Sequence, residues 1–130
     1  IEGKVKPIVF LTSNNTREIG DALKRRCLHL YIPFPDAKLE AQIIASRIPD
    51  IEKNLKIELV NFVQNLRELD LKKLPSVAET IDWAKSLVLL NVKSLDASLV
   101  RETLNVLLKF QSDIDAADSE IEAIIRKGNA

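Results

Sequence analysis

Apolar residues recur three or four positions apart from residue 39 to residue 125, the spacing that places them on one face of a helix. Asp36 is a predicted N-cap of the first helical segment, and Pro49 ends that segment. The pattern predicts four or five amphipathic helices between residues 36 and 130. Predicted inner-face residues are Leu39, Ile43, Ile44, Ile48, Leu55, Leu59, Phe62, Val63, Leu66, Val77, Ile81, Ala84, Val88, Leu99, Val100, Leu104, Leu107, Leu108, Ile114, Ile121, Ile124 and Ile125.

Capping residues predict where these helices begin. Ser76 and Glu79 have the spacing of a capping box, in which the serine caps a backbone N–H and the glutamate reaches back. Asp96 is a predicted N-cap, and Ser112 with Asp115 predicts a second capping box for the last segment.

The first part of the chain has a different pattern. Residues 8–11 and 28–32 are short apolar runs that predict two parallel strands, joined by a crossover with a short helix near residues 19–24. Pro33 and Pro35 end the second run. We place a domain boundary between residues 35 and 36. Two strands alone are only marginally stable in water, and the chain contains no methionine. For both reasons we expect the chain to be the C-terminal part of a longer protein. A processed or engineered start would look the same.

Composition excludes several classes of function. The 19 basic and 19 acidic residues balance, so no global charge points to nucleic acid or to an anionic membrane. No signal peptide is visible, no apolar run approaches the roughly 20 residues that cross a bilayer, and the single cysteine suits the cytoplasm. The single cysteine and the single histidine supply no metal-ligand cluster, and we expect His29 to be structural. Cys27 has no catalytic base nearby in the sequence, so we expect it to be a small buried residue. Trp83 has apolar neighbours, so we expect it to lie in the core.

Two local features suggest chemistry. The first predicted strand ends in "TSNN", whose amides and hydroxyls would lie at the carboxyl edge of a sheet, where ligands bind, although these residues are also common in turns. Lys24, Arg25 and Arg26 follow the short helix. They could stabilise its C-terminus, or an arginine among them could reach a phosphate in a neighbouring subunit.

The stretch "PIVFLTSNNTREIGDALKRRCLHLYIPFPD", followed by the helices, resembles the end of an AAA+ ATPase module. The resemblance is to the MoxR-type group, in the branch linked to carbon monoxide dehydrogenase maturation and to proteins with von Willebrand factor A domains. It covers nearly the whole chain. "LTSNN" matches the strand of the first nucleotide sensor, "ALKRRC" the arginine-finger segment, and "PSVAETIDWAKSL" the start of a lid helix. The implied fold is mostly α: residues 1–35 end an α/β P-loop nucleotide-binding core with two parallel strands, and residues 36–130 form a helical lid of four or five helices.

The resemblance also implies site residues. Asn14 matches the sensor asparagine, with Asn15 as the alternative, and Arg26 or Arg25 matches the finger. Many lids carry an arginine just after the serine and valine of the lid helix, where this chain has Ala78, so we transfer no second sensor.

The implied function is ATP-driven remodelling or maturation of a client, with ATP and Mg²⁺ bound by the intact parent protein. Its partners would be identical subunits in a hexameric ring and a von Willebrand factor A protein or metalloenzyme client. The chain contains no G-x-x-x-x-G-K-[ST] motif and no apolar run ending in paired acidic residues, so we expect it neither to hydrolyse ATP alone nor to bind it tightly. Two alternatives remain open: a non-enzymatic helical interaction module, and the lid region of a DNA-directed AAA+ protein such as a clamp loader or helicase.

Overall fold

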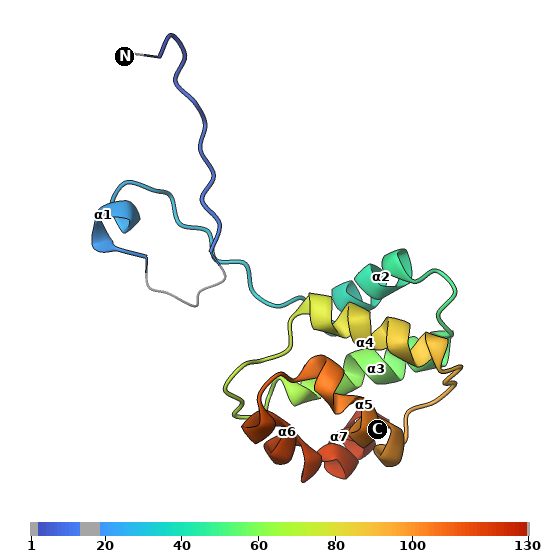
Figure 1. Ribbon diagram of the computed structural model, residues 1–130. Helices are drawn as coiled ribbons and strands as arrows, with labels where there is room; N and C mark the ends of the chain where they lie inside the picture. The colour runs from blue at the N-terminus through green and yellow to red at the C-terminus, as the bar shows by residue number, and fades with distance from the viewer. Residues whose placement is uncertain (1–2, 14–18, 130) are drawn as a thin grey trace. The chain divides into compact units, whose positions relative to one another are not determined.

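The computed structural model of the chain describes residues 3–13 and 19–129 (Figure 1). The chain divides into two units, residues 1–32 and residues 33–130. Asn14 and Asn15 lie outside the described residues.

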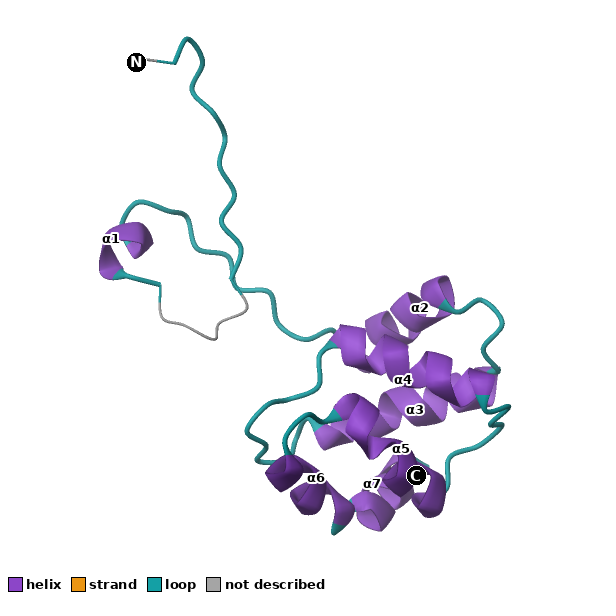
Figure 2. Cartoon of the chain, viewed as in Figure 1, coloured by secondary structure: helices purple, strands orange, loops and turns teal. Residues whose placement is uncertain are grey.

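The described part of residues 1–32 contains one short helix, α1 (Asp21–Lys24), with extended segments on both sides. The two predicted parallel strands are not seen: within the described ranges the structure has helices and loops and no strand, as Figure 2 shows. Residues 8–11 and 28–32 are exposed along their whole length. The physical reason is that a two-stranded sheet gains too little from pairing, and parallel strands need layers that cover both faces.

The second unit is a helical bundle, as predicted. Its helices are α2 (Ala37–Arg47), α3 (Lys53–Leu66), α4 (Val77–Leu89), α5 (Ala97–Leu107), α6 (Gln111–Asp118) and α7 (Ile121–Gly128). Helix α3 packs against α2, α4 and α7, while α5 packs against α4, α6 and α7. Helix α4 in turn packs against α2, α3 and α5, and it lies in front of α3 in the view of Figure 1.

Three of the predicted helix starts are confirmed. Asp36 Oδ1 accepts a hydrogen bond from the Leu39 amide at 2.8 Å, and Asp96 Oδ1 accepts one from the Leu99 amide at 2.9 Å. The capping box of α4 is also present, and it is described with the site below. Each cap satisfies a backbone donor that the first turn of a helix leaves without an intrahelical partner.

The end of α4 has the geometry of a Schellman motif. Asn91 adopts a left-handed conformation with φ 54°. Its amide bonds to the Val88 carbonyl at 3.0 Å, and the Val92 amide bonds to the Leu87 carbonyl at 3.0 Å. Asparagine adopts this left-handed conformation more readily than most other non-glycine residues. Asn91 can therefore end the helix at this position.

The last predicted segment divides into two helices, and its predicted capping box is wrong. Helix α6 begins at Gln111 with Phe110 as its N-cap residue. Asp113 is buried, and its carboxylate accepts hydrogen bonds from the backbone amides of Lys72 and Lys73 at 2.8 and 3.1 Å. A tertiary contact to the α3–α4 loop therefore determines how α6 is placed.

The core surrounds Trp83, which is fully buried as predicted. Its ring lies 5.4 Å from the ring of Phe62, centroid to centroid, with the planes tilted by 47°. The indole Nε1 donates to Thr103 Oγ1 at 2.8 Å, so the one polar atom of Trp83 is satisfied in the interior.

Candidate functional site

Helix α1 positions the predicted finger arginines. The Arg25 amide donates to the Asp21 carbonyl at 3.1 Å, and the Arg26 amide donates to the Leu23 carbonyl at 3.0 Å. Arg25 is the C-cap residue, with φ −73° and ψ −21°. The backbone therefore places both arginines at the C-terminal end of the helix, where cations are favoured by the helix dipole.

The side chains of these arginines are available for a ligand. Arg25 and Arg26 are exposed, and neither forms an ion pair with another described residue. By contrast, the guanidinium of Arg67 donates hydrogen bonds to the Pro75 carbonyl and to the Glu40 carboxylate within the bundle. An exposed guanidinium without a carboxylate partner can bind a phosphate oxygen pair in a bidentate manner.

The partner group expected at this site is not described. Asn14 and its alternative Asn15 lie outside the described residues, so their distance from Arg25 or Arg26 stays a prediction. Two neighbours of the arginines can be described. Cys27 is exposed, which corrects its expected burial, and His29 is exposed as well.

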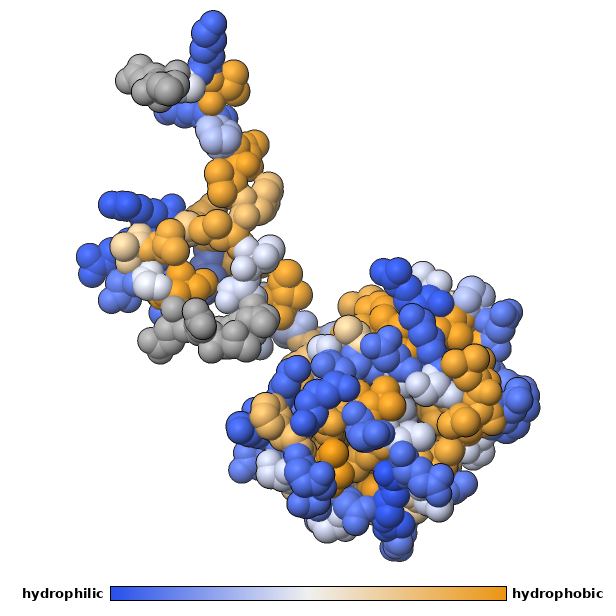
Figure 3. Space-filling view, in the orientation of Figure 1, coloured by the Kyte–Doolittle hydropathy of each residue, from blue (hydrophilic) through white to orange (hydrophobic). Residues whose placement is uncertain are grey.

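Apolar side chains on both sides of α1 are strongly exposed. Phe10, for example, exposes 87% of its surface, and Ile32 exposes 79%. Figure 3 shows hydrophobic residues along the extended segments next to α1. The exposed apolar residues of this unit are Val5, Ile8, Val9, Phe10, Leu11, Leu23, Leu28, Leu30, Tyr31 and Ile32. Since consecutive residues of an extended chain face opposite sides, both sides of each segment are apolar and uncovered.

At the predicted start of the lid helix, the polar side chains of Ser76 and Glu79 are bonded to each other's groups. The Ser76 amide donates to Glu79 Oε2 at 2.8 Å, and the Ser76 hydroxyl donates to the same carboxylate. Lys73 Nζ lies 3.4 Å from Glu79 Oε1. Partial burial raises the pKa of Glu79, but the hydrogen bonds from Ser76 and the charge of Lys73 outweigh this effect and lower it. Glu79 is therefore engaged in holding the helix start.

Sequence reasoning missed a buried polar network between α2, α3 and α4. Glu40 is fully buried and accepts hydrogen bonds from Arg67 and Gln64. The sequence does contain a signal for it, because Glu40 has the same four-residue spacing from Ile44 that Ile44 has from Ile48. Every buried side-chain nitrogen or oxygen in the described residues has a hydrogen-bond partner, so none of these buried side-chain atoms is left open for a ligand.

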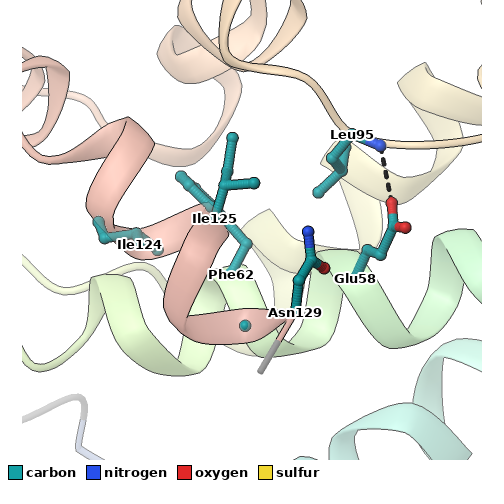
Figure 4. A pocket seen from close by; sticks show the side chains of 7 residues that line it. Glu58, Phe62, Leu95, Ile124, Ile125 and Asn129 are labelled. Carbon is teal, nitrogen blue, oxygen red and sulfur yellow. Dashed lines mark hydrogen bonds between the residues drawn. The ribbon is translucent and has the colours of Figure 1, made fainter.

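A small pocket lies between α3, α7 and the loop before α5 (Figure 4). Its volume is about 10 Å³, room for about one water molecule. Glu58 stands at its edge and accepts a hydrogen bond from the Leu95 amide at 2.7 Å. Small-molecule sites are usually tens of times larger, so this pocket does not hold a substrate.

Neither a metal cluster nor a membrane helix is found where the chain is described. In those ranges no group of three or more His, Cys, Asp or Glu residues is placed to hold a metal ion. No helix there has both the length and the apolar character needed to cross a bilayer.

Comparison of the chain with protein-family models, with curated proteins and with solved structures found no match.

Proposed function

We propose that the chain is the C-terminal portion of a MoxR-type AAA+ ATPase, with residues 1–35 ending the nucleotide-binding core and residues 36–130 forming the lid. The single observation that carries the proposal is the exposure of the apolar residues in the described ranges 8–13 and 19–32. Two apolar segments with exposed side chains flank a short helix, and the helix is followed by Arg25 and Arg26, which form no ion pair with the described residues. Apolar side chains on both sides of a segment are expected of neighbouring strands in a parallel sheet whose two faces are covered by other elements.

In this proposal ATP is bound between subunits of a hexameric ring. Asn14, or Asn15 in its place, would hold the attacking water, because an amide both donates and accepts hydrogen bonds without carrying charge. Arg26, or Arg25, would reach the γ-phosphate bound to the neighbouring subunit. Such an arginine stabilises charge that develops in the transition state.

The two arginines fit an anionic phosphate because both are exposed and without an ion pair among the described residues. The described residues do not supply a carboxylate cluster for Mg²⁺. The residues that hold Mg²⁺ and the phosphate loop would therefore belong to the rest of the parent protein. Hydrolysis would change how the lid is held, and the client would be a protein with a von Willebrand factor A domain or a metalloenzyme under maturation, in the cytoplasm.

The direct test is the reading frame upstream of residue 1. We expect a G-x-x-x-x-G-K-[ST] motif within about 200 residues, the size of one further domain, and ATP hydrolysis by the extended protein. The matched control is the extended protein with the phosphate-loop lysine changed to alanine, which should be inactive. An upstream frame without the motif would end the proposal.

The alternatives predict different results. A helical interaction module would have no phosphate loop upstream and no nucleotide dependence. A clamp loader or helicase would show ATP hydrolysis stimulated by DNA, whereas the balanced charge of this chain favours protein clients.

A further inference from the structure

The residue just before α4 carries a buried carbonyl group that needs a hydrogen-bond donor. Pro75 is buried and directly precedes Ser76, the N-cap residue of α4. Its carbonyl comes before the helix, so it must be satisfied by a group from elsewhere in the chain. Arg67, the C-cap residue of α3, supplies this group, because its Nε donates to the Pro75 carbonyl at 2.8 Å. The end of α3 is thus bonded to the chain that leads into α4.

Arg67 also contacts the first turn of α4. Its Nη2 donates to Thr80 Oγ1 at 3.3 Å, and this hydroxyl donates to the Ser76 carbonyl at 3.1 Å. Thr80 is fully buried, so the contact is made on the inner side of the helix. One guanidinium therefore holds the start of α4 at two points, the carbonyl before the helix and a hydroxyl within its first turn.

Glu40 of α2 determines how the Arg67 guanidinium is oriented. The buried Glu40 carboxylate accepts hydrogen bonds from Nη2 at 2.7 Å and from Nη1 at 2.8 Å. Because the guanidinium is planar, fixing these two nitrogens also fixes the direction of Nε, the nitrogen that bonds to Pro75. The described hydrogen bonds of Glu40 go to Arg67 and Gln64 and not to α4, so Glu40 acts on the helix start through Arg67.

We propose that Arg67 is a positioning residue for α4: Glu40 orients its guanidinium, and the guanidinium sets the place of Pro75 and of the first turn of α4. In the proposed ATPase α4 is the start of the lid helix, so Arg67 would position the lid, and this assignment rests on the proposed function. The positioning itself involves only contacts among residues 40–80, and it can be measured on the chain without ATP. An upstream reading frame without a phosphate loop would therefore end the proposed function and leave the positioning role intact.

Hydrogen exchange of the full chain, followed by NMR, tests the positioning role. In the unmodified chain the Arg67 Nε–H should exchange slowly, because this side chain is 6% exposed and its Nε is bonded to Pro75. The reference is the Nε–H of Arg101, which is bonded to Asp118 but belongs to a side chain that is 44% exposed. An Arg67 Nε–H that exchanges as fast as that of Arg101 would overturn the proposal, whatever the variants do.

Glu40→Gln tests the route from α2 to the helix start. Glutamine keeps the size of the side chain but removes the charge that orients Arg67. We expect the exchange rate of the Thr80 amide, divided by that of the Leu104 amide in α5, to rise about tenfold or more. The division removes the effect of a general loss of stability, which accelerates both amides alike. An unchanged ratio in a folded variant would contradict the proposal.

The double variant Glu40→Leu with Arg67→Met separates positioning from stability. No buried charge remains in it, so the free energy of unfolding should recover in part. The Pro75 carbonyl and the Thr80 hydroxyl still lack their donor, so the exchange ratio should stay raised. A ratio that returns to that of the unmodified chain would show that Arg67 serves stability alone. This variant also decides the question if Glu40→Gln does not fold.

Glu58→Gln is the matched control, because Glu58 is a carboxylate that holds a different helix start. It accepts a hydrogen bond from the Leu95 amide at 2.7 Å, in the loop before α5. The substitution removes the same charge as Glu40→Gln but leaves the contacts of Arg67 in place. It should not raise the exchange ratio of Thr80 to Leu104, and a rise equal to that of Glu40→Gln would refute a specific route through Arg67.

Discussion

Arg67 and Glu40 form a two-pronged ion pair inside the helical bundle, with Nη2–Oε1 at 2.7 Å and Nη1–Oε2 at 2.8 Å. The Arg67 side chain is 6% exposed and the Glu40 side chain is fully buried. Glu40 comes from α2 and Arg67 directly follows α3, so one pair joins the two helices. Because a buried charge is costly without its partner, a single substitution that removes one member of this pair should destabilise the bundle strongly.

Arg67→Met should lower the free energy of unfolding by about 3–5 kcal/mol, because Gln64 alone cannot compensate the buried Glu40 carboxylate. Urea denaturation followed by Trp83 fluorescence measures this loss. Changing both residues, as Glu40→Leu with Arg67→Met, should recover part of the loss, since no buried charge then remains.

The control for this prediction is Arg101→Met. Arg101 pairs with Asp118 at 2.8 Å, but both side chains are nearly half exposed. Exposed pairs contribute at most about 1 kcal/mol. Equal losses for Arg67→Met and Arg101→Met would show that the buried pair has no special role.

Thr103→Val should destabilise the bundle by about 1–3 kcal/mol, because it leaves the buried Trp83 Nε1–H without an acceptor. Thr103→Ser keeps the hydroxyl and should cost less. Both variants are measured by urea denaturation and by the Trp83 emission spectrum. A serine variant as unstable as the valine variant would assign the effect to the lost methyl group.

Glu79 should make the bundle less stable as the pH falls into the acidic range. Its pKa is lowered from 4.5 in the folded chain, so folding favours the carboxylate. The contribution is therefore fully present above pH 4.5 and disappears as the pH falls through the lower folded-state pKa. Unfolding of the unmodified chain and of Glu79→Gln, compared across this range, should show a stability difference that shrinks on acidification. A difference that is constant with pH would refute this assignment.

In the proposed parent ATPase, Arg26→Ala should lower the rate of ATP hydrolysis by about 10³–10⁵-fold and leave ATP affinity nearly unchanged. The reason is that a finger arginine acts on the transition state from a neighbouring subunit. Arg25→Ala decides between the two arginines, and Lys24→Ala is the control for general loss of charge. Equal losses of turnover and affinity would count against a finger.

In the proposed parent ATPase, Asn14→Ala should slow hydrolysis far more than it weakens ATP binding, because the proposed sensor amide would orient water and not the nucleotide base. Asn15→Ala is the matched comparison, and it should become the more damaging change if Asn15 fills the role. Single-turnover hydrolysis and equilibrium nucleotide binding separate the two effects. Full activity in both variants would remove Asn14 and Asn15 from the proposed site.

Local sequence predicted the helices well because caps and apolar spacing act over three or four residues. Asp36, Asp96 and Ser76 with Glu79 mark helix starts that the structure confirms. The same reasoning failed at Ser112, since Asp113 is drawn inward by backbone amides forty residues earlier in the chain. A contact at that distance leaves no short-range signal.

On the inner face of α2, too, the local pattern and a tertiary contact determine different residues. Apolar spacing predicted Leu39 on the inner face, yet Leu39 is 49% exposed and Glu40 is fully buried. The period of the pattern was correct, but a charged residue can occupy the inner face only where donors such as Arg67 and Gln64 reach it from another helix.

By itself the sequence determined that residues 36–130 form a helical bundle with Trp83 in its core, and it determined where most of the helices begin, because these properties follow from side-chain type and short spacing. Only the tertiary structure decided that Glu40 lies inside, that α6 and α7 separate, and that residues 8–11 and 28–32 form no strands. Strand pairing and ion-pair burial depend on partners distant in the chain, and free energy favours them only when those partners are in place.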